Sequence, residues 1–193
     1  MLIFLRMLDK LFTSKARIKI LGYLFFKKKE TYLRETAKEL NLSPSAVKRE
    51  FDNLAEIDII KKQKNKIILN ESNPFFEELK QIFLKTDFIA YPIKEALTKK
   101  DIEFALIFGS FAKGNFNSES DLDLLIIGKI SLSEAIKLLN PAEKIIERNI
   151  NPIIWNLHEF KERRKGKFAS EIFSGKILMI KGDENELRKI ARG

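Results

Sequence analysis

Two carboxylates separated by one residue follow a Gly-Ser pair in the second half of the chain. Gly109-Ser110 ends one apolar run, and Asp121-Leu122-Asp123 begins the next. On a β-strand, residues two positions apart point to the same face, so Asp121 and Asp123 would present their carboxylates together. Adjacent carboxylates repel unless a hard cation lies between them, and Mg²⁺ or Mn²⁺ takes carboxylate and phosphate oxygens together. The pattern therefore predicts a divalent metal site with a phosphorylated ligand.

The turn between the two apolar runs has the residue types of a phosphate-binding loop. Gly109 lacks a Cβ, so the backbone can approach a ligand closely, and backbone N–H groups in such a turn can bind phosphate oxygens. Ser110 adds a hydroxyl, Lys113 adds a movable positive charge, and Gly114 lets the chain turn back. With Ser120, these residues are the predicted nucleotide-binding set. We expect the ligand to be a nucleoside triphosphate and catalysis to come from positioning and charge neutralisation.

This stretch resembles the polymerase-β-like nucleotidyltransferases, and most of all the minimal nucleotidyltransferases of bacteria and archaea. The resemblance rests on Gly109-Ser110-Phe111-Ala112-Lys113-Gly114 followed by Ser120-Asp121-Leu122-Asp123, and it covers residues 101 to about 185. It implies that Gly109 and Ser110 hold the triphosphate and that Asp121 and Asp123 hold the metals. The implied reaction transfers a nucleoside monophosphate to an acceptor and releases pyrophosphate.

The sequence departs from that family at one position. Active members usually add a third carboxylate from a later strand, and the equivalent residue here is Asn151. An amide oxygen is a weaker metal ligand and cannot act as a general base. Glu147 is the alternative source of a third carboxylate. Nucleotide and metal binding are expected to survive this departure better than turnover.

The first half of the chain predicts three helices followed by a hairpin. The first helix is expected from a Ser14 cap to about Phe26, and the second from about Tyr32 to Leu40. Ser43 and Pro44 begin the third, since Ser is a good N-cap and Pro suits the first helical position. The third helix should end near Ile57, and the hairpin strands are predicted at Ile59–Lys62 and Lys66–Leu69. This order resembles a winged helix-turn-helix over roughly residues 10 to 70.

A winged helix-turn-helix implies double-stranded DNA as a partner. The net charge of +9 lies mostly in the first hundred residues, as expected for a surface that meets a polyanion. The predicted DNA contacts are Ser45, Lys48, Arg49, Lys61, Lys62, Lys64 and Lys66. The alternative is a solvated face used for protein contact, in a chain that is simply rich in lysine.

The predicted fold class is α+β with two domains. Residues 1–72 form the winged helix-turn-helix, 73–100 a helical linker, and 101–193 a nucleotidyltransferase-type α/β domain with a mixed sheet. The strands of this sheet are expected at Phe104–Phe108, Leu122–Ile127, Pro152–Asn156 and Ile177–Ile180.

Composition excludes several other classes of site. The chain has no cysteine and one histidine, so disulfides, thiolate sites and His-rich metal clusters are excluded. No apolar run approaches the roughly 20 residues of a membrane span, and a cytoplasmic location without membrane contact is expected. Met1–Phe12 is interpreted as an amphipathic helix, with Leu5, Leu8 and Phe12 on one side, that packs on the body or on a second copy in a homodimer.

Two clusters in the second half keep open interpretations. The basic residues Lys161, Arg163, Arg164, Lys165 and Lys167 could grip an acceptor RNA or a triphosphate, or form a charged helix surface. Trp155 is expected in the core, and His158 in an exposed loop or cap.

The leading functional hypothesis is a DNA-binding transcriptional regulator with a nucleotidyltransferase domain and an unknown acceptor. One alternative is a regulator whose degenerate domain only senses nucleotide. Another is a toxin–antitoxin component that modifies a partner.

Overall fold

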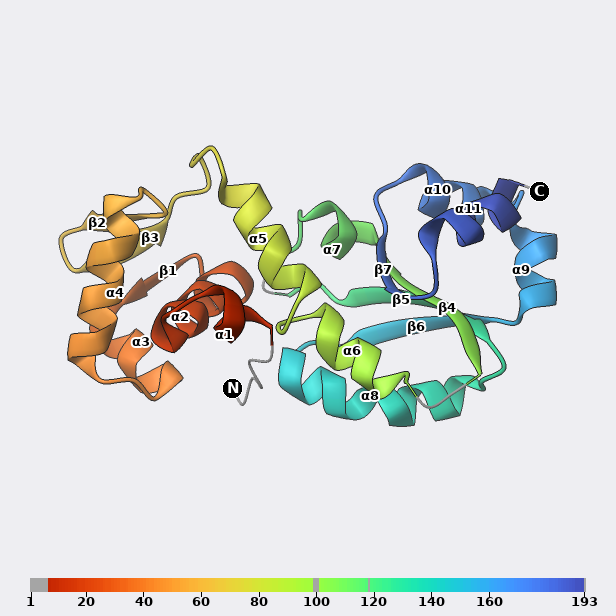
Figure 1. Cartoon of the computed structure of the whole chain (residues 1–193), viewed down its shortest axis with the longest axis horizontal. Coiled ribbons are helices and arrows are strands. Elements are labelled where there is room, and N and C mark those ends of the chain that lie inside the picture. The colour runs from red at the N-terminus through yellow and green to blue at the C-terminus, as the bar shows by residue number, and fades with distance from the viewer. Residues whose placement is uncertain (1–6, 99–100, 118, 193) are drawn as a thin grey trace. The chain divides into compact units, whose positions relative to one another are not determined.

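The computed structural model describes residues 7–98, 101–117 and 119–192, and the chain forms two compact units (Figure 1). The N-terminal unit runs to Phe88 and the C-terminal unit begins at Ile89. The boundary lies inside the stretch 73–100 that the sequence set apart as a linker. Both halves of that stretch are helical, but each helix belongs to a different unit. None of the helices in the described ranges is long and apolar enough to cross a membrane.

From residue 7 onward, where the structure describes it, the N-terminal unit combines five helices with a three-stranded antiparallel sheet of order β1-β3-β2. Its elements are α1 (Leu8–Leu11), α2 (Lys15–Phe26), β1 (Glu30–Tyr32), α3 (Leu33–Leu40), α4 (Pro44–Glu56), β2 (Ile60–Gln63), β3 (Lys66–Leu69) and α5 (Phe76–Lys85). The predicted helices and hairpin are present within a residue or two at each end. The strand β1 was not predicted. It has only three residues, and its pairing with β3 is a long-range contact that no local pattern reveals.

Local sequence accounts for the helix boundaries of this unit. The Ser14 hydroxyl accepts a hydrogen bond from the Arg17 backbone N–H, and the Ser43 hydroxyl accepts one from Ala46, so both predicted caps are confirmed. Pro44 occupies the first turn of α4, where a missing N–H costs nothing. Asn41 ends α3 in the left-handed conformation, with φ of 49°.

Aromatic side chains build the core that holds α5 in this unit. The Phe25 ring lies 5.6 Å from that of Phe76 and 5.3 Å from that of Phe83, both near a right angle. Edge-to-face pairs of this kind add to the free energy of burial. Residues 1–6 of the predicted N-terminal helix, Leu5 included, lie outside the described residues. Of the remainder, Leu8 is buried and the Phe12 ring lies 5.7 Å from Phe83.

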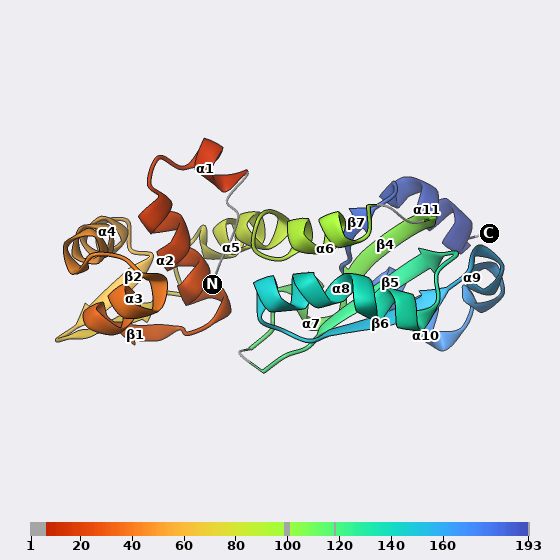
Figure 2. The same ribbon diagram turned by 90° about the horizontal axis from the view of Figure 1, so that it is seen from below.

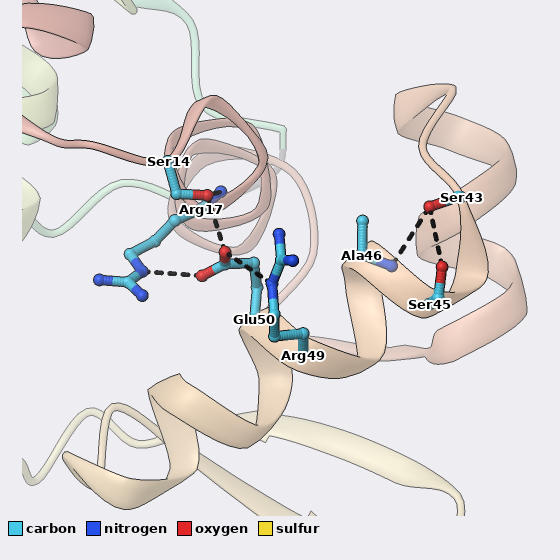
Figure 3. Close-up of polar contacts among 7 residues, drawn as sticks. All are labelled: Ser14, Arg17, Ser43, Ser45, Ala46, Arg49 and Glu50. Atoms are coloured by element: carbon cyan, nitrogen blue, oxygen red, sulfur yellow. Dashed lines mark hydrogen bonds and ion pairs between the residues drawn. The ribbon is translucent and has the colours of Figure 1, made fainter.

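A buried carboxylate joins α4 to the start of α2 (Figure 3). The Glu50 side chain is 3% exposed. It accepts hydrogen bonds from the Ser14 hydroxyl at 2.7 Å and from the Arg17 Nε at 2.8 Å. Burial by itself raises the pKa of Glu50, but these donors and the Arg17 charge outweigh it, so the pKa lies below its usual value. The ion pair thus fixes α4 against α2.

The C-terminal unit is a four-stranded mixed sheet of order β6-β5-β4-β7 with helices on both faces. Its elements are α6 (Ala90–Ala96), β4 (Ile102–Phe108), α7 (Gly109–Lys113), β5 (Leu122–Gly128), α8 (Leu132–Ile146), β6 (Ile150–Trp155), α9 (Leu157–Arg163), α10 (Lys167–Ser174), β7 (Leu178–Lys181) and α11 (Glu184–Arg192). Figure 1 shows α6 and α8 on one side of this sheet and α10 and α11 on the other, and Figure 2 looks at it from the α8 side. The predicted mixed sheet and its four strands are confirmed.

The register of this sheet brings the chemistry-bearing segments together. The strands β4 and β5 run antiparallel with Phe108 opposite Asp123, and β5 and β6 run parallel with Asp123 opposite Asn151. Successive side chains of β4, β5 and β6 point alternately to the two faces of the sheet, as the strand period of two requires. One face packs on α9, α10 and α11 through a cluster that includes Leu106, Leu125 and Trp155.

We expect replacement of Glu50 by Gln to lower the free energy of unfolding of the N-terminal unit by about 1–3 kcal/mol at pH 7. Because the folded-state pKa of Glu50 is lowered, its contribution is present above the ordinary value of 4.5 and is lost as pH falls through the lowered pKa. The difference between wild type and variant should therefore shrink below that pH. Hydrogen exchange of amides in α2 and α4 measures the effect.

Glu56→Gln is the matched control, because it removes the same charge from an exposed position at the end of the same helix. An equal loss in both variants, or a loss in Glu50→Gln that does not change with pH, would contradict the assignment.

Candidate active site

The end of β4 and the start of β5 make a close contact at Gly109. Gly109 has φ of +71°, a conformation that L side chains rarely adopt, and a Cβ built there would lie 2.7 Å from Oδ2 of Asp123. Only glycine lets the backbone turn here with the carboxylate beside it. Because Phe108 and Asp123 are cross-strand partners, the Gly109-Ser110 turn and the Asp123 side chain are neighbours despite their separation in sequence.

Asp123 is half-buried and lies in the field of a second carboxylate. Burial raises the pKa of Asp123, a hydrogen bond from Asn151 lowers it, and the charge of Asp121 raises it, with a net shift upward. Asn151, on the exposed start of β6, is therefore beside Asp123, as its register position requires. The two carboxylates and one amide gather at one edge of the sheet.

Asp121 is held by neighbours that sequence reasoning missed. Asn149 Nδ2 donates to Asp121 Oδ1 at 3.2 Å, and Arg148 Nη1 donates to the Ser120 carbonyl at 3.3 Å. The Arg148 guanidinium also lies 5.7 Å from the centroid of the Phe111 ring. Burial lowers the pKa of Arg148, and the negative charge of Asp121 opposes that shift. Arg148 and Asn149 come directly before β6, which runs parallel to β5. Because parallel strands begin at the same edge of a sheet, this position could have placed both residues near Asp121.

The predicted phosphate-binding residues lie on the short segment around α7. Ser110 is in its first turn and partly exposed, and Lys113 is exposed at its last residue. Gly114 ends the helix with φ of +86°. The Ser120 Oγ accepts from the Asn117 N–H and donates to Asn117 Oδ1, both at 3.0 Å. It thereby shapes the turn that leads into Asp121.

Among the described residues, no third carboxylate is grouped with Asp121 and Asp123 as a metal ligand would be. Within the described parts of the chain, no group of three or more His, Cys, Asp or Glu side chains could share a metal ion. Glu147 is the C-cap of α8, with φ of 55°, and not a residue of β6. It lines a cavity of about 460 Å³ that opens beside Asp121. The other lining residues are Glu119, Ser120, Asn140, Glu143, Lys144, Arg148 and Asn149.

The residues predicted to contact DNA lie on the surface of the N-terminal unit. Ser45, Lys48 and Arg49 are exposed along α4, and Lys61 and Lys64 are exposed on the hairpin. Three of the predicted cations form ion pairs. Arg49 Nε lies 3.9 Å from Glu50 Oε1 on the same helix (Figure 3). Lys62 pairs with Asp52 of α4, and Lys66 Nζ lies 2.6 Å from Glu30 Oε2. The hairpin therefore presents less unneutralised charge than its sequence suggests.

The remaining candidates of the C-terminal unit occupy the α9–α10 region. Trp155 is 5% exposed and belongs to the core, as predicted. His158 is exposed on α9, with Nδ1 3.6 Å from Glu162 Oε2. In the basic cluster, Arg163 lies over the Trp155 ring at 5.8 Å and Arg164 donates to the Ile190 carbonyl at 3.1 Å. These two arginines therefore have packing roles.

Comparison with known structures finds proteins of low sequence identity. A toxin–antitoxin complex with AMP-PNP is 12% identical, with a TM-score of 0.43 over 54% of this chain and 82% of that one. A mutant of the toxin–antitoxin pair MntA–HpeT is 10% identical, with a TM-score of 0.42 over 53% and 81%. A Sulfolobus solfataricus protein assigned as a nucleotidyltransferase is 22% identical, with a TM-score of 0.30 over 43% and 75%. No curated protein matches the chain.

Comparison with protein families finds one match in the part of the chain that contains this site. The model of the family described as polymerase beta, nucleotidyltransferase matches residues 91–185. The match begins ten residues before the expected domain start and so includes most of α6. Both segments of the candidate site, at the end of β4 and at the start of β5, fall within it. Residues 91–185 are a polymerase beta nucleotidyltransferase domain.

Proposed function

We propose that the C-terminal unit transfers a nucleoside monophosphate from a nucleoside triphosphate to an acceptor. The observation that carries this proposal is the contact between the Gly109 turn and Asp123, with Asp121 directly before β5 and two residues from Asp123. Transfer of a nucleoside monophosphate needs a phosphate-binding turn close to carboxylates that can bind cations. The register of β4 and β5 brings the Gly109 turn to Asp123, as this reaction would require.

The donor set fits a divalent cation. Burial raises the pKa of Asp123 and the negative charge of Asp121 raises it further, and a hard cation would relieve the repulsion between the two carboxylates. Asp121 and Asp123 would hold Mg²⁺ or Mn²⁺, with the Asn151 amide oxygen as a weaker ligand. When bound, the metal supplies charge neutralisation on the phosphate oxygens.

The residues of the chain itself bind and orient the nucleotide. The backbone N–H groups of Gly109 and Ser110 would bind phosphate oxygens, and the Ser110 hydroxyl would add a donor. Lys113, exposed at the end of α7, would place its positive charge on the triphosphate. Arg148 and Asn149 hold Asp121 in position through the contacts described above. Catalysis then depends on alignment of the α-phosphate with the acceptor.

Calorimetric titration of ATP and the other triphosphates with Mg²⁺ tests this site. Binding by the wild type should depend on the metal and should be lost in Asp121→Asn/Asp123→Asn, because the variant removes both negative ligands. Asp101→Asn is the matched control, since it removes one exposed carboxylate just before β4, at the opposite end of that strand. A wild type that does not bind, or a double variant that binds equally well, would contradict the proposal.

A nucleotide sensor without turnover is the second candidate, and Asn151 is the observation that favours it. A neutral amide opposite Asp123 cannot take a proton from an acceptor hydroxyl. Transfer of labelled nucleotide, abolished by Asp121→Asn, would exclude the sensor.

Replacement of Asn151 by Asp should raise transfer activity about tenfold or more, because it restores a carboxylate that can act as a general base. The assay is the rate of labelled nucleotide transfer, or of pyrophosphate release, at saturating Mg-ATP. Asn156→Asp is the matched control, since Asn156 follows the other end of β6 as the N-cap of α9, a position that Asp fills equally well. An unchanged or lower rate in Asn151→Asp, with Mg-ATP binding retained, would contradict the assigned role of position 151.

A further alternative keeps the same transfer reaction and concerns the identity of the acceptor. A toxin–antitoxin component would modify a partner protein or RNA. Incubation with labelled ATP and the product of the neighbouring gene tests it, and label should then appear on that partner and not on a control protein.

We propose that the N-terminal unit is a winged helix-turn-helix that binds double-stranded DNA. The observation that favours it is the exposure of Ser45, Lys48 and Arg49 along α4, the helix that follows the tight turn at Ser43. In this arrangement the helix would enter the major groove and Lys61 and Lys64 of the hairpin would contact phosphates.

Replacement of Lys48 and Arg49 by Ala should weaken duplex binding about tenfold and lower the salt dependence by about two in the slope of log K against log salt. The measurement is fluorescence anisotropy of a labelled duplex at several salt concentrations. Lys15→Ala/Lys85→Ala is the matched control, with the same charge change at exposed positions outside α4 and the hairpin. Undetectable binding at low salt, or equal losses in both variants, would contradict DNA binding.

A further inference from the structure

An aromatic side chain lies partly exposed beside Phe108, the cross-strand partner of Asp123. Phe168, the second residue of α10, is 42% exposed. Its ring lies 5.9 Å from that of Phe108 at an angle of 87° and 5.8 Å from that of Trp155 at 79°. An exposed phenylalanine needs no explanation by itself. This one is fixed by the Trp155 ring of the core cluster and by the Phe108 ring packed against that cluster, while part of its surface stays open to solvent.

The sheet register places Phe168 on the same face as the candidate active site. Phe108 precedes the Gly109 turn and is the cross-strand partner of Asp123, and cross-strand partners in an antiparallel pair point to the same face. Leu125 lies two residues after Asp123 on β5, so both side chains point to the same face of the sheet. Leu125 packs in the core cluster beneath α10. The Phe168 ring therefore packs against Phe108, and Phe108 is paired directly with Asp123. This position is within the reach of the sugar and base of a nucleotide whose phosphates lie at Gly109.

The surroundings of Phe168 suit an anionic aromatic ligand. Lys165 and Lys167 are exposed just before it, in the loop and first turn that lead into α10. The Arg163 guanidinium lies 5.8 Å over the Trp155 ring, which stiffens the support behind Phe168. A preordered ring loses little entropy when a base stacks on it.

We propose that Phe168 stacks on the base of the bound nucleoside triphosphate, as a substrate-binding residue. This inference rests on the proposed nucleotide site. Stacking on a phenyl ring uses the face of the base and none of its hydrogen-bonding edge, so every base can stack. The stacking energy increases with the area of the base. The site should therefore bind purine triphosphates more tightly than pyrimidine ones and distinguish ATP from GTP weakly.

Titration of Mg-ATP and of Mg-tripolyphosphate, which lacks sugar and base, separates stacking from phosphate binding. Phe168→Ala should weaken ATP binding about ten- to hundredfold and leave tripolyphosphate binding unchanged. Phe168→Trp should restore ATP binding, whereas Phe168→Leu, which keeps an apolar side chain without the ring, should not. Trp155 is the single tryptophan of the chain and touches Phe168, so ATP but not tripolyphosphate should change its emission.

Ile136→Ala is the matched control, because Ile136 is 45% exposed on α8, on the other face of the sheet. Thermal unfolding followed by Trp155 emission checks that each variant is folded, and Phe168→Leu carries the test if Phe168→Ala is not. The inference is overturned if the wild type binds both ligands and Phe168→Ala leaves ATP binding intact or weakens both ligands equally. It is also overturned if the variants lose single-stranded oligonucleotide binding and keep ATP binding. A wild type that binds neither ligand would instead remove the nucleotide site itself.

Discussion

The close approach of the Gly109 backbone to the Asp123 carboxylate is the contact on which the C-terminal unit depends. A Cβ at position 109 would lie 2.7 Å from Asp123 Oδ2, and φ of +71° is strained for any side chain. The pairing of Phe108 with Asp123 sets this distance, and a slip of one residue in β5 would turn the Asp123 carboxylate to the opposite face. The parallel pairing of β5 with β6 then adds Asn151 to the same edge. Sheet register and site geometry are therefore one constraint, and the apolar residues that hold the register also hold the site.

The polar neighbours of the two carboxylates explain how the site can be ordered by the protein alone. Asn149 donates to Asp121, and Arg148 fixes the carbonyl that precedes it. Asn151 donates to Asp123 and lowers a pKa that burial and Asp121 raise. Each carboxylate thus has its own support, which limits the reorganisation needed when a ligand binds. In the N-terminal unit, Glu50 provides the comparable support between α2 and α4.

Local rules predicted most of the fold, and long-range pairing accounts for what they missed. The Ser14 and Ser43 caps, the position of Pro44 and the apolar runs of the mixed sheet depend on neighbouring residues only, so the sequence reveals them. The strand β1, the supporting roles of Arg148 and Asn149 and the place of Phe168 depend on register or on helix docking between distant segments. The unit boundary at Phe88 lies inside the predicted linker 73–100, and local sequence could not place it more closely for the same reason. The helix α5 has an ordinary amphipathic pattern, and its contacts with Phe12 and Phe25 assign it to the N-terminal unit.

The neutral residue at position 151 changes the electrostatics of the site in two opposing directions. A third carboxylate beside Asp123 would add repulsion to a group whose pKa is already raised, and would destabilise the edge of the sheet without a cation. Asn151 avoids that cost and donates a hydrogen bond that lowers the pKa of Asp123, so Asp123 stays ionised more readily. The same substitution removes one negative ligand and the only base that β6 could offer from that position. The arrangement therefore favours a site that is stable without a ligand. In such a site, alignment of the reactants by Gly109, Asp121 and Asp123 must provide the rate acceleration that a general base at position 151 would have provided.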